Sequence, residues 1–262
     1  MNQRDKGEAF RALHAGPAFV IPNPWDAGSA RMLTSLGFSA LATTSSGFAF
    51  TLGRSDGAAT LDEMAAHATA IDGATSLPVS VDLENGYGPR PEDAARAITR
   101  IAESGAVGGS VEDWDRDGEF LYDIPQASER IAAAVEAARR LDFPFTLTAR
   151  AENHIRGHHD LDDTIARLQA FERAGADVVF APGLATVEEI RQVCNAVTKP
   201  VNVLARRNLM VGEIAAAGAR RISIGGALTW VAVDAMIQAA TAIRDAGDLS
   251  VLSGGNPFDS LS

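Results

Sequence analysis

The chain has 262 residues, of which 46% are hydrophobic, enough to bury the core of one large domain. It carries 34 acidic and 23 basic residues, a net charge of −11, and contains no run of Lys or Arg that would follow a phosphate backbone or an anionic membrane. Nucleic acid and membrane partners are therefore not expected. The single cysteine, Cys194, argues against an internal disulfide or a cysteine-based zinc site, and we interpret it as a buried thiol.

The N-terminal residues have no apolar segment typical of a signal peptide, and nowhere do 18 apolar residues follow one another. We therefore expect a cytoplasmic protein. Eight short apolar runs have the composition of strands that are covered on both faces. They are residues 18–21, 40–44, 78–84, 108–113, 145–152, 177–183, 200–205 and 221–226.

Between these runs, apolar residues recur every three or four positions, as they do on one face of a helix. The clearest sets are Ala94, Ile98 and Ile101; Ile131, Val135 and Ala138; Leu161, Ile165 and Leu168. Two helix starts are marked by capping-box spacing, Thr60 with Glu63 and Thr186 with Glu189, and Pro91 suits a first helical turn.

Repeated alternation of strand and helix over residues 18–246, with no linker, predicts an α/β fold of the (β/α)8 TIM-barrel type, with 1–262 as a single domain. An open doubly wound sheet is the alternative, but "IPNPWDAG" stands where its G-x-G-x-x-G would follow the first strand. Residues 247–262 are polar and Gly-rich, and we expect a tail or a subunit contact there.

In a barrel of this type the chemistry lies where strands end and the following loops begin. The unusual polar residues of this chain fall at those points. They are Ser45, Ser46 and Gly47 after the second strand, Asp82 and Glu84 at the third, Glu112 and Asp113 at the fourth, and Arg150 and Glu152 at the fifth.

Asp82 and Glu84 are two residues apart, so on a strand they would share a face, with Glu112 arriving from the neighbouring strand. Like charges crowded together repel unless a cation or protons neutralise them. Carboxylates are hard oxygen ligands of the kind that Mg²⁺ or Mn²⁺ accepts, and we predict such a site here. The alternatives are capping of the next helix or ion pairs with Arg90 and Arg150.

Arg150 offers a forked cation suited to a substrate carboxylate, although a salt bridge with Glu152 or Glu112 would also account for it. The turn after the second strand could present the N–H groups of Gly47 and Phe48 to a developing oxyanion. Ser-Gly turns are common, and most of them serve only as turns.

Among the histidines, His14 and His67 are expected on helix surfaces, and His158 and His159 in a loop. His154 follows Arg150 closely enough to be a candidate site residue. Neither a Ser-His-Asp order nor an H-E-x-x-H spacing is present, which argues against hydrolases of those types.

Several motifs in order resemble those of the isocitrate lyase/phosphoenolpyruvate mutase superfamily, over most of the chain from residue 22 to beyond 224. They are "TSSGF" (44–48), Asp56 in "GRSDG", "VDLENGYG" (81–88), "GSVEDW" (109–114) and "TARAENH" (148–154). The resemblance implies a Mg²⁺-dependent barrel enzyme that acts on a 2-oxo acid, or a precursor of one, through a pyruvate-type enolate.

The resemblance also implies roles for individual residues. By position, Asp82, Glu84 and Glu112 match the acidic metal shell, and Asp56 matches an acid of its outer part. The residues that would hold the substrate are Ser46, Gly47, Phe48, Arg150, His154 and Asn202. Those expected to take part in catalysis are Arg150, Ser46, Asp56 and Glu112. Together with the apolar helical stretch at 227–243, the resemblance predicts a homo-oligomer, a tetramer, in which this helix packs on another subunit.

The loop after the fourth strand departs from the family pattern. Isocitrate and methylisocitrate lyases carry K-K-C-G-H there, whereas residues 112–126 read "EDWDRDGEFLYDIPQ", without Cys, Lys or His. The phosphonopyruvate-handling members place Lys and Asn in this loop, and neither is present. What remains resembles the decarboxylase and less-characterised lyase branch.

We therefore predict a carbon-carbon lyase for a 2-oxo or 2-hydroxy acid, with decarboxylation of oxaloacetate as the model reaction. The enolate would need a proton, from Tyr87, His154 or water. Two alternatives are phosphorus-carbon chemistry, as in a phosphonopyruvate hydrolase or mutase, and binding of a 2-oxo acid without turnover.

Overall fold

The barrel is formed by eight parallel strands in a computed structural model that describes residues 1–255 and 258. The strands are β1 (Phe19–Ile21), β2 (Leu41–Ala42), β3 (Val79–Asp82), β4 (Gly108–Glu112), β7 (Thr146–Arg150), β8 (Val178–Phe180), β9 (Val201–Leu204) and β10 (Arg221–Ser223). Their order in the sheet is β1-β10-β9-β8-β7-β4-β3-β2. The edge strands β1 and β2 approach each other where the Ala42 N–H donates to the Pro22 carbonyl at 3.1 Å. The predicted (β/α)8 barrel is confirmed, and all eight expected strands are present, though shorter than the apolar runs.

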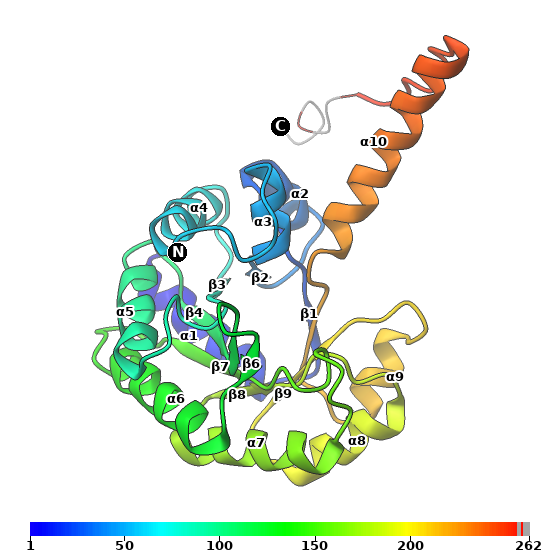
Figure 1. The fold of residues 1–262 in the computed structure, drawn as a ribbon. Helices are drawn as coiled ribbons and strands as arrows, with labels where there is room; N and C mark the ends of the chain where they lie inside the picture. Colours follow the sequence, from blue (N-terminus) through cyan, green and yellow to red (C-terminus); the bar gives the residue numbers. More distant parts are fainter. Residues whose placement is uncertain (256–257, 259–262) are drawn as a thin grey trace.

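Helices surround this sheet (Figure 1). They are α1 (Gln3–Ala15), α2 (Ala27–Ser35), α3 (Ser45–Thr51), α4 (Leu61–Gly73), α5 (Pro91–Ala102), α6 (Ile124–Arg139), α7 (Leu161–Ala174), α8 (Val187–Ala196), α9 (Val211–Ala216) and α10 (Ala227–Ala246). The capping boxes expected at Thr60 and Thr186 are present, and Pro91 is the first residue of α5. One element was not predicted, a small hairpin of β5 (Trp114–Asp115) and β6 (Phe120–Leu121).

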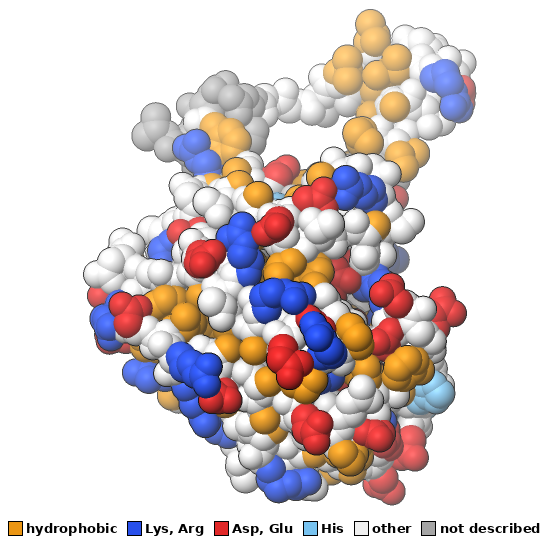
Figure 2. Space-filling model, turned by 60° about the vertical axis from the view of Figure 1, so that its left-hand side comes forward, with side chains coloured by type: hydrophobic (Ala, Val, Ile, Leu, Met, Phe, Trp, Pro, Cys, Tyr) orange, Lys and Arg blue, Asp and Glu red, His pale blue; other side chains and the backbone are white. Residues whose placement is uncertain are grey.

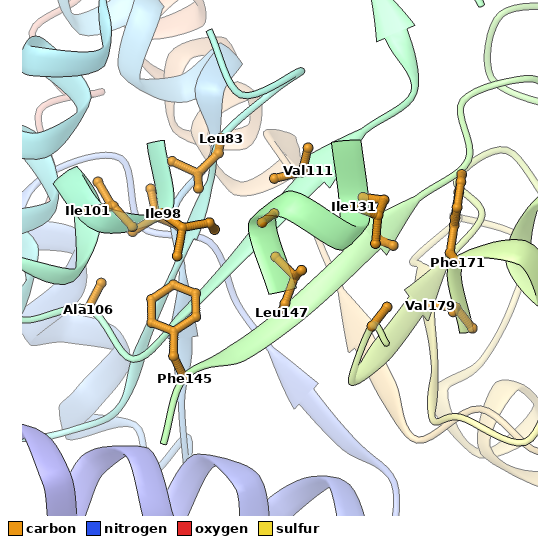
Figure 3. Close-up of a cluster of buried hydrophobic side chains, with 14 of the residues drawn as sticks. Leu83, Ile98, Ile101, Ala106, Val111, Ile131, Phe145, Leu147, Phe171 and Val179 are labelled. Atoms are coloured by element: carbon orange, nitrogen blue, oxygen red, sulfur yellow. The ribbon is translucent and has the colours of Figure 1, made fainter. Parts of the chain in front are cut away.

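The main core lies between the strands and the helices that cover them. In Figure 3, Ile98 and Ile101 of α5 and Ile131 of α6 face Val111 of β4 and Leu147 of β7. All five side chains are at most 2% exposed. Because apolar area removed from water is the main favourable term in folding, this layer holds the strands in place and with them the residues at their ends.

Helix α1 lies across the end of the barrel where the strands begin. The Gln3 amide donates to the carbonyls of Ala102, at the end of α5, and Ala106, just before β4. A side chain at Gly7 would collide with the Pro144 carbonyl just before β7, and the His14 ring meets Arg221 at the start of β10. The opposite end, where the strands finish, is left for the site.

The expectation that His14 and His67 lie on helix surfaces is wrong. His14 is 7% and His67 8% exposed, because the His14 ring packs edge-on against Phe10 and Phe19 and the His67 ring stacks on Phe48 with centroids 4.0 Å apart. Burial lowers the pKa of His14 to about 3 and that of His67 to about 4, so both are neutral at pH 7. Cys194 is half-buried rather than buried, and burial raises the pKa of its thiol to about 11.

Helix α10 extends away from the barrel (Figure 1), and of its residues only Thr229 is buried. Apolar side chains gather along it in Figure 2, and Val231, Met236 and Ile237 are each more than half exposed, at 63%, 59% and 52%. In the described part of the chain, no helix combines the length and hydropathy needed to span a membrane. Of the expected tail 247–262, residues 256–257 and 259–262 lie outside the described residues.

Candidate active site

A polar cavity of about 210 Å³ opens at the end of the barrel where the strands finish. Of the ten residues to which the sequence analysis gave a catalytic, substrate-binding or metal role, five line its wall: Ser46, Asp56, Asp82, Arg150 and Asn202. The other five candidates are buried around it or face elsewhere: Gly47, Phe48, Glu84, Glu112 and His154. The barrel therefore brings together side chains from β3, β7, β9 and the segments after β2.

Asp82 ends β3, and its carboxylate lines the cavity. Its contacts are all long: 3.5 Å from the Ser45 N–H, 3.3 Å from the Glu84 N–H, 3.5 Å from the Ser110 hydroxyl and 3.7 Å from Arg150. A carboxylate with no short hydrogen bond retains its oxygens for another partner. Asp82 is therefore available to a cation or a substrate hydroxyl.

Glu84 does not share a face with Asp82, so that expectation is wrong. Strand β3 ends at Asp82, and Glu84, with a φ of 49°, begins a turn in which Gly86 and Tyr87 also have positive φ, at 81° and 60°. This left-handed backbone breaks the alternation of a strand and is uncommon for residues other than glycine. The Glu84 side chain turns toward a neighbouring cleft of about 640 Å³ and pairs with Arg116 at 2.9 Å.

Burial raises the pKa of Glu84 to about 7, an effect that Arg116 opposes and the charge of Asp82 reinforces. Its Oε1 atom is buried and has no hydrogen-bond partner. Buried polar atoms are normally paired, so this oxygen is one that an additional donor or cation would satisfy.

Arg150 ends β7 and joins three carboxylates. Its Nε donates to Glu152, and its NH1 lies 3.3 Å from Glu112 and 3.7 Å from Asp82. The salt bridges weighed as an alternative are thus present, yet the side chain also lines the cavity. Burial acts to lower the pKa of Arg150, but the three carboxylates together outweigh it and raise that pKa. Burial raises the pKa of Glu112 well above its ordinary value.

The segment after β2 is a helix rather than an open turn. Within α3 the Phe48 N–H donates to the Thr44 carbonyl at 3.0 Å, and the Gly47 N–H to the Thr44 hydroxyl at 3.4 Å. A side chain at Gly47 would meet Thr44 and Thr229, which explains the glycine by packing. The Ser46 hydroxyl lies on the cavity wall, 3.1 Å from that of Thr44. The oxyanion role of the two amides stays a prediction, and it would require α3 to release them.

The remaining candidates differ in their access to the cavity. Asp56 is exposed and lines it, and its charge contributes to the raised pKa of Glu84. Asn202 lines it from β9, with its amide donating to the Ser223 hydroxyl at 3.0 Å. His154 does not line it, because its ring is buried against the Thr164 hydroxyl at 2.8 Å.

Sequence reasoning missed four residues around the cavity. Asn23, in the segment "PNPW", accepts the N–H groups of Ile224 and Gly225 and donates to the Thr43 carbonyl, joining β1, β2 and β10. The other three are arginines: Arg116, Arg156 and Arg221. An arginine in a sequence gives no sign of which carboxylate or cavity its long side chain will reach, so their positions required the structure.

Arg116 and Arg156 fix the loop after β4, the region where the family pattern is absent. Arg116 reaches Glu84, and its guanidinium occupies the space that a side chain at Gly57 would need. Arg156 lies over the Trp114 ring, 4.7 Å from its centroid, and pairs with Glu152 at 2.8 Å. Residues of three segments are thus held together beside the cavity.

The donor set fits a hard divalent cation, although no site for it is ready-made. Among residues 1–255 and 258, no three carboxylate, imidazole or thiolate side chains are grouped in a way that could hold a metal ion. Arg150 and Arg116 stand among the acids instead. Asp82, without a short contact, and the unpaired Oε1 of Glu84 are the oxygens that could serve a metal.

Comparisons with known proteins found a matching family model and several similar proteins. A family model described as phosphoenolpyruvate phosphomutase matches residues 10–244. An uncharacterized protein from Mycobacterium tuberculosis is 32% identical over 238 residues, 90% of this chain and 88% of the relative. An oxaloacetate decarboxylase from Rhodopseudomonas palustris is 30% identical over 266 residues, 97% of this chain and 90% of the relative. A solved structure of a candidate lyase/mutase from Burkholderia cenocepacia is 50% identical, with a TM-score of 0.94 and coverage of 98% of this chain and 94% of that chain.

Proposed function

The chain belongs to the phosphoenolpyruvate phosphomutase family, and we propose that within it this protein is a lyase that uses Mg²⁺ or Mn²⁺ to cleave a carbon-carbon bond of a 2-oxo or 2-hydroxy acid. The family match confirms the resemblance read from the motifs. Decarboxylation of an acid like oxaloacetate is the model reaction, supported by the similarity to an oxaloacetate decarboxylase. The observation that carries the proposal is Asp82 and Arg150 on the wall of one small polar cavity, a carboxylate with only long contacts beside a cation.

The residues of the chain have separable roles in this reaction. Arg150, held by Glu152 and Glu112, fixes a substrate carboxylate, and the Ser46 hydroxyl donates to an oxygen of the same substrate. The apolar side chains of Phe180 and Leu204 on the same wall limit access of water to the enolate.

Asp82 would hold the divalent cation, with Glu84, Glu112 and Asp56 adding negative charge around it. The cation would supply Lewis-acid stabilisation of the negative charge that develops on the oxo oxygen. Arg116 pairs with Glu84 and Arg150 with Glu112, and these ion pairs hold the two carboxylates in place. The assignment of these acids to the metal stays a prediction.

The cleaved bond leaves an enolate that must take up a proton. Tyr87 and His154 do not line the cavity, although the Tyr87 hydroxyl is buried without a hydrogen-bond partner and its pKa is raised by burial. Among the three candidates, this geometry favours water.

The cytoplasmic location and the division into a barrel at 18–246 and a tail at 247–262 also stay predictions.

The test is product analysis on a small panel of acids. We expect the protein with Mg²⁺ to convert oxaloacetate to pyruvate and carbon dioxide, or a substituted 2-hydroxy diacid to a 2-oxo acid and a second carboxylic acid, seen by proton NMR. Chelation should abolish this reversibly, and a heat-inactivated sample with the same Mg²⁺ controls for spontaneous decarboxylation. Phosphate release from phosphonopyruvate would instead support phosphorus-carbon chemistry, and binding of these acids without any product would support a binding protein.

We also propose that the protein is a homo-oligomer, a tetramer, in which α10 packs on a neighbouring subunit. An exposed apolar helix of this kind is typical of an interface. Light scattering at micromolar concentration should give a multiple of the 27.5 kDa chain mass, and Met236→Glu with Ile237→Glu should reduce it. A monomeric mass for the unchanged protein would contradict the proposal.

A further inference from the structure

Arg221 is a buried cation at the floor of the cavity. The residue is 5% exposed and lines the cavity together with Asn202 and Ser223. Its Nε donates to the Asn202 side-chain oxygen at 2.9 Å and its NH2 to the Thr148 hydroxyl at 2.9 Å, while its NH1 lies 3.4 Å from His14 Nε2. All three partners are neutral, because the pKa of His14 is lowered to about 3.

No carboxylate among the described residues pairs with this guanidinium. Burial lowers the pKa of Arg221 to about 9, so the group remains charged at pH 7. A buried charge without a counter-charge is costly in a folded protein. A guanidinium also has five N–H donors, of which the three contacts use only three. Both facts indicate that an anion completes this site.

The interior of the barrel around Arg221 is suited to a polar ligand. Barrels of this type are normally filled with layers of bulky apolar side chains. Here the cavity wall includes Ser80, Ser110 and Ser223 on three strands. These small hydroxyl side chains leave room above the guanidinium and can donate hydrogen bonds to an oxygen.

The cavity thus has a cation at each of two levels. Arg221 contacts Thr148, which precedes Arg150 by two residues on β7, a separation of about 7 Å along a strand. Arg150 stands at the mouth beside Asp82, and Arg221 stands below. A ligand that carries an acidic group at each end would satisfy both.

We propose that Arg221 binds the second carboxylate of the substrate and makes the enzyme selective for dicarboxylates over monocarboxylates. This inference rests on the proposed function, since it concerns the acid that the same cavity turns over. Arg221 acts on the end of the substrate away from the metal, so its effect falls on the choice of substrate rather than on the cation.

The test uses two stable acids that differ only at the far end, malate and 2-hydroxybutyrate, in which a methyl group replaces the second carboxylate. Calorimetry in the presence of Mg²⁺ should show that the unchanged protein binds malate at least about tenfold more tightly. In Arg221→Met this ratio should fall to about one, with the affinity for 2-hydroxybutyrate unchanged. Arg221→Lys, which keeps the charge, should retain part of the preference and serves if the methionine variant does not fold.

A matched control is Arg130→Met, which removes a side chain that is equally buried, 1% exposed, but does not line the cavity. It should lower the melting temperature and leave the ratio of affinities as it was. Equal binding of both acids by the unchanged protein, or an equal loss of affinity for both acids in Arg221→Met, would overturn the role of Arg221 but not the proposed function. Binding of neither acid overturns the proposed function, and this inference with it.

Discussion

Asp82→Asn should abolish turnover and most of the stabilisation by Mg²⁺ without disturbing the fold. The four contacts of Asp82 are all 3.3 Å or longer, so an amide of the same shape loses little in the absence of metal. Removing one charge also relieves repulsion with Glu84, whose pKa the charge of Asp82 helps to raise. The variant should therefore be at least as stable as the unchanged protein when no metal is added.

When metal is added, the unchanged protein should become more stable than Asp82→Asn. Mg²⁺ or Mn²⁺ should raise the melting temperature of the unchanged protein by mass action on the folded state, and that of the variant much less. Loss of an oxygen that contacts the metal should lower metal affinity by more than the roughly 10–100-fold that outer partners cost. Asp123→Asn, at the N-cap of α6 and away from the cavity, is the matched control, because Asn also caps helices well.

If Asp82→Asn responds to Mg²⁺ in the same way as the unchanged protein and keeps its activity, Asp82 does not hold the metal. If neither protein responds to metal and activity survives exhaustive chelation, the proposed metal dependence itself is falsified.

Arg150→Lys should lower kcat/KM by about 30-fold, equivalent to about 2 kcal/mol of transition-state stabilisation. Lysine keeps the charge, but its single ammonium group cannot contact Glu152, Glu112 and a substrate carboxylate at once, as the guanidinium can. The free energy of unfolding should also fall, by about 1–3 kcal/mol, because a buried carboxylate loses a hydrogen-bond donor. This loss would be seen as a lower melting temperature.

Arg156→Lys separates the two effects. Arg156 also pairs with Glu152, at 2.8 Å, and lies 3.8 Å from Glu112, yet it does not line the cavity. Arg156→Lys should therefore lower the free energy of unfolding but reduce turnover much less than Arg150→Lys does. Both variants are measured by thermal melting and steady-state kinetics on one preparation each. A destabilised but fully active Arg150→Lys would reduce that residue to a structural role.

The barrel and its helices could be predicted because they depend on local patterns. Apolar runs such as 177–183 and apolar faces such as that of Ile98 and Ile101 identify strands and helices whose apolar surface must be buried, and few architectures bury eight such alternations. The capping boxes that begin at Thr60 and Thr186 are also local patterns, because the capping residue and its glutamate partner lie within one helical turn. The strands are shorter than their apolar runs, because tertiary contacts decide where a ladder of backbone hydrogen bonds stops.

The sequence by itself also determined which end of the barrel carries the polar residues, because strand direction places Asp82, Glu112 and Arg150 at one rim. Only the tertiary structure decided what each of them contacts. A left-handed turn sends Glu84 toward Arg116, and Arg221 reaches the cavity floor from the opposite end of its strand. Long charged side chains are directed by partners far away in the chain, and that information is absent from any local pattern.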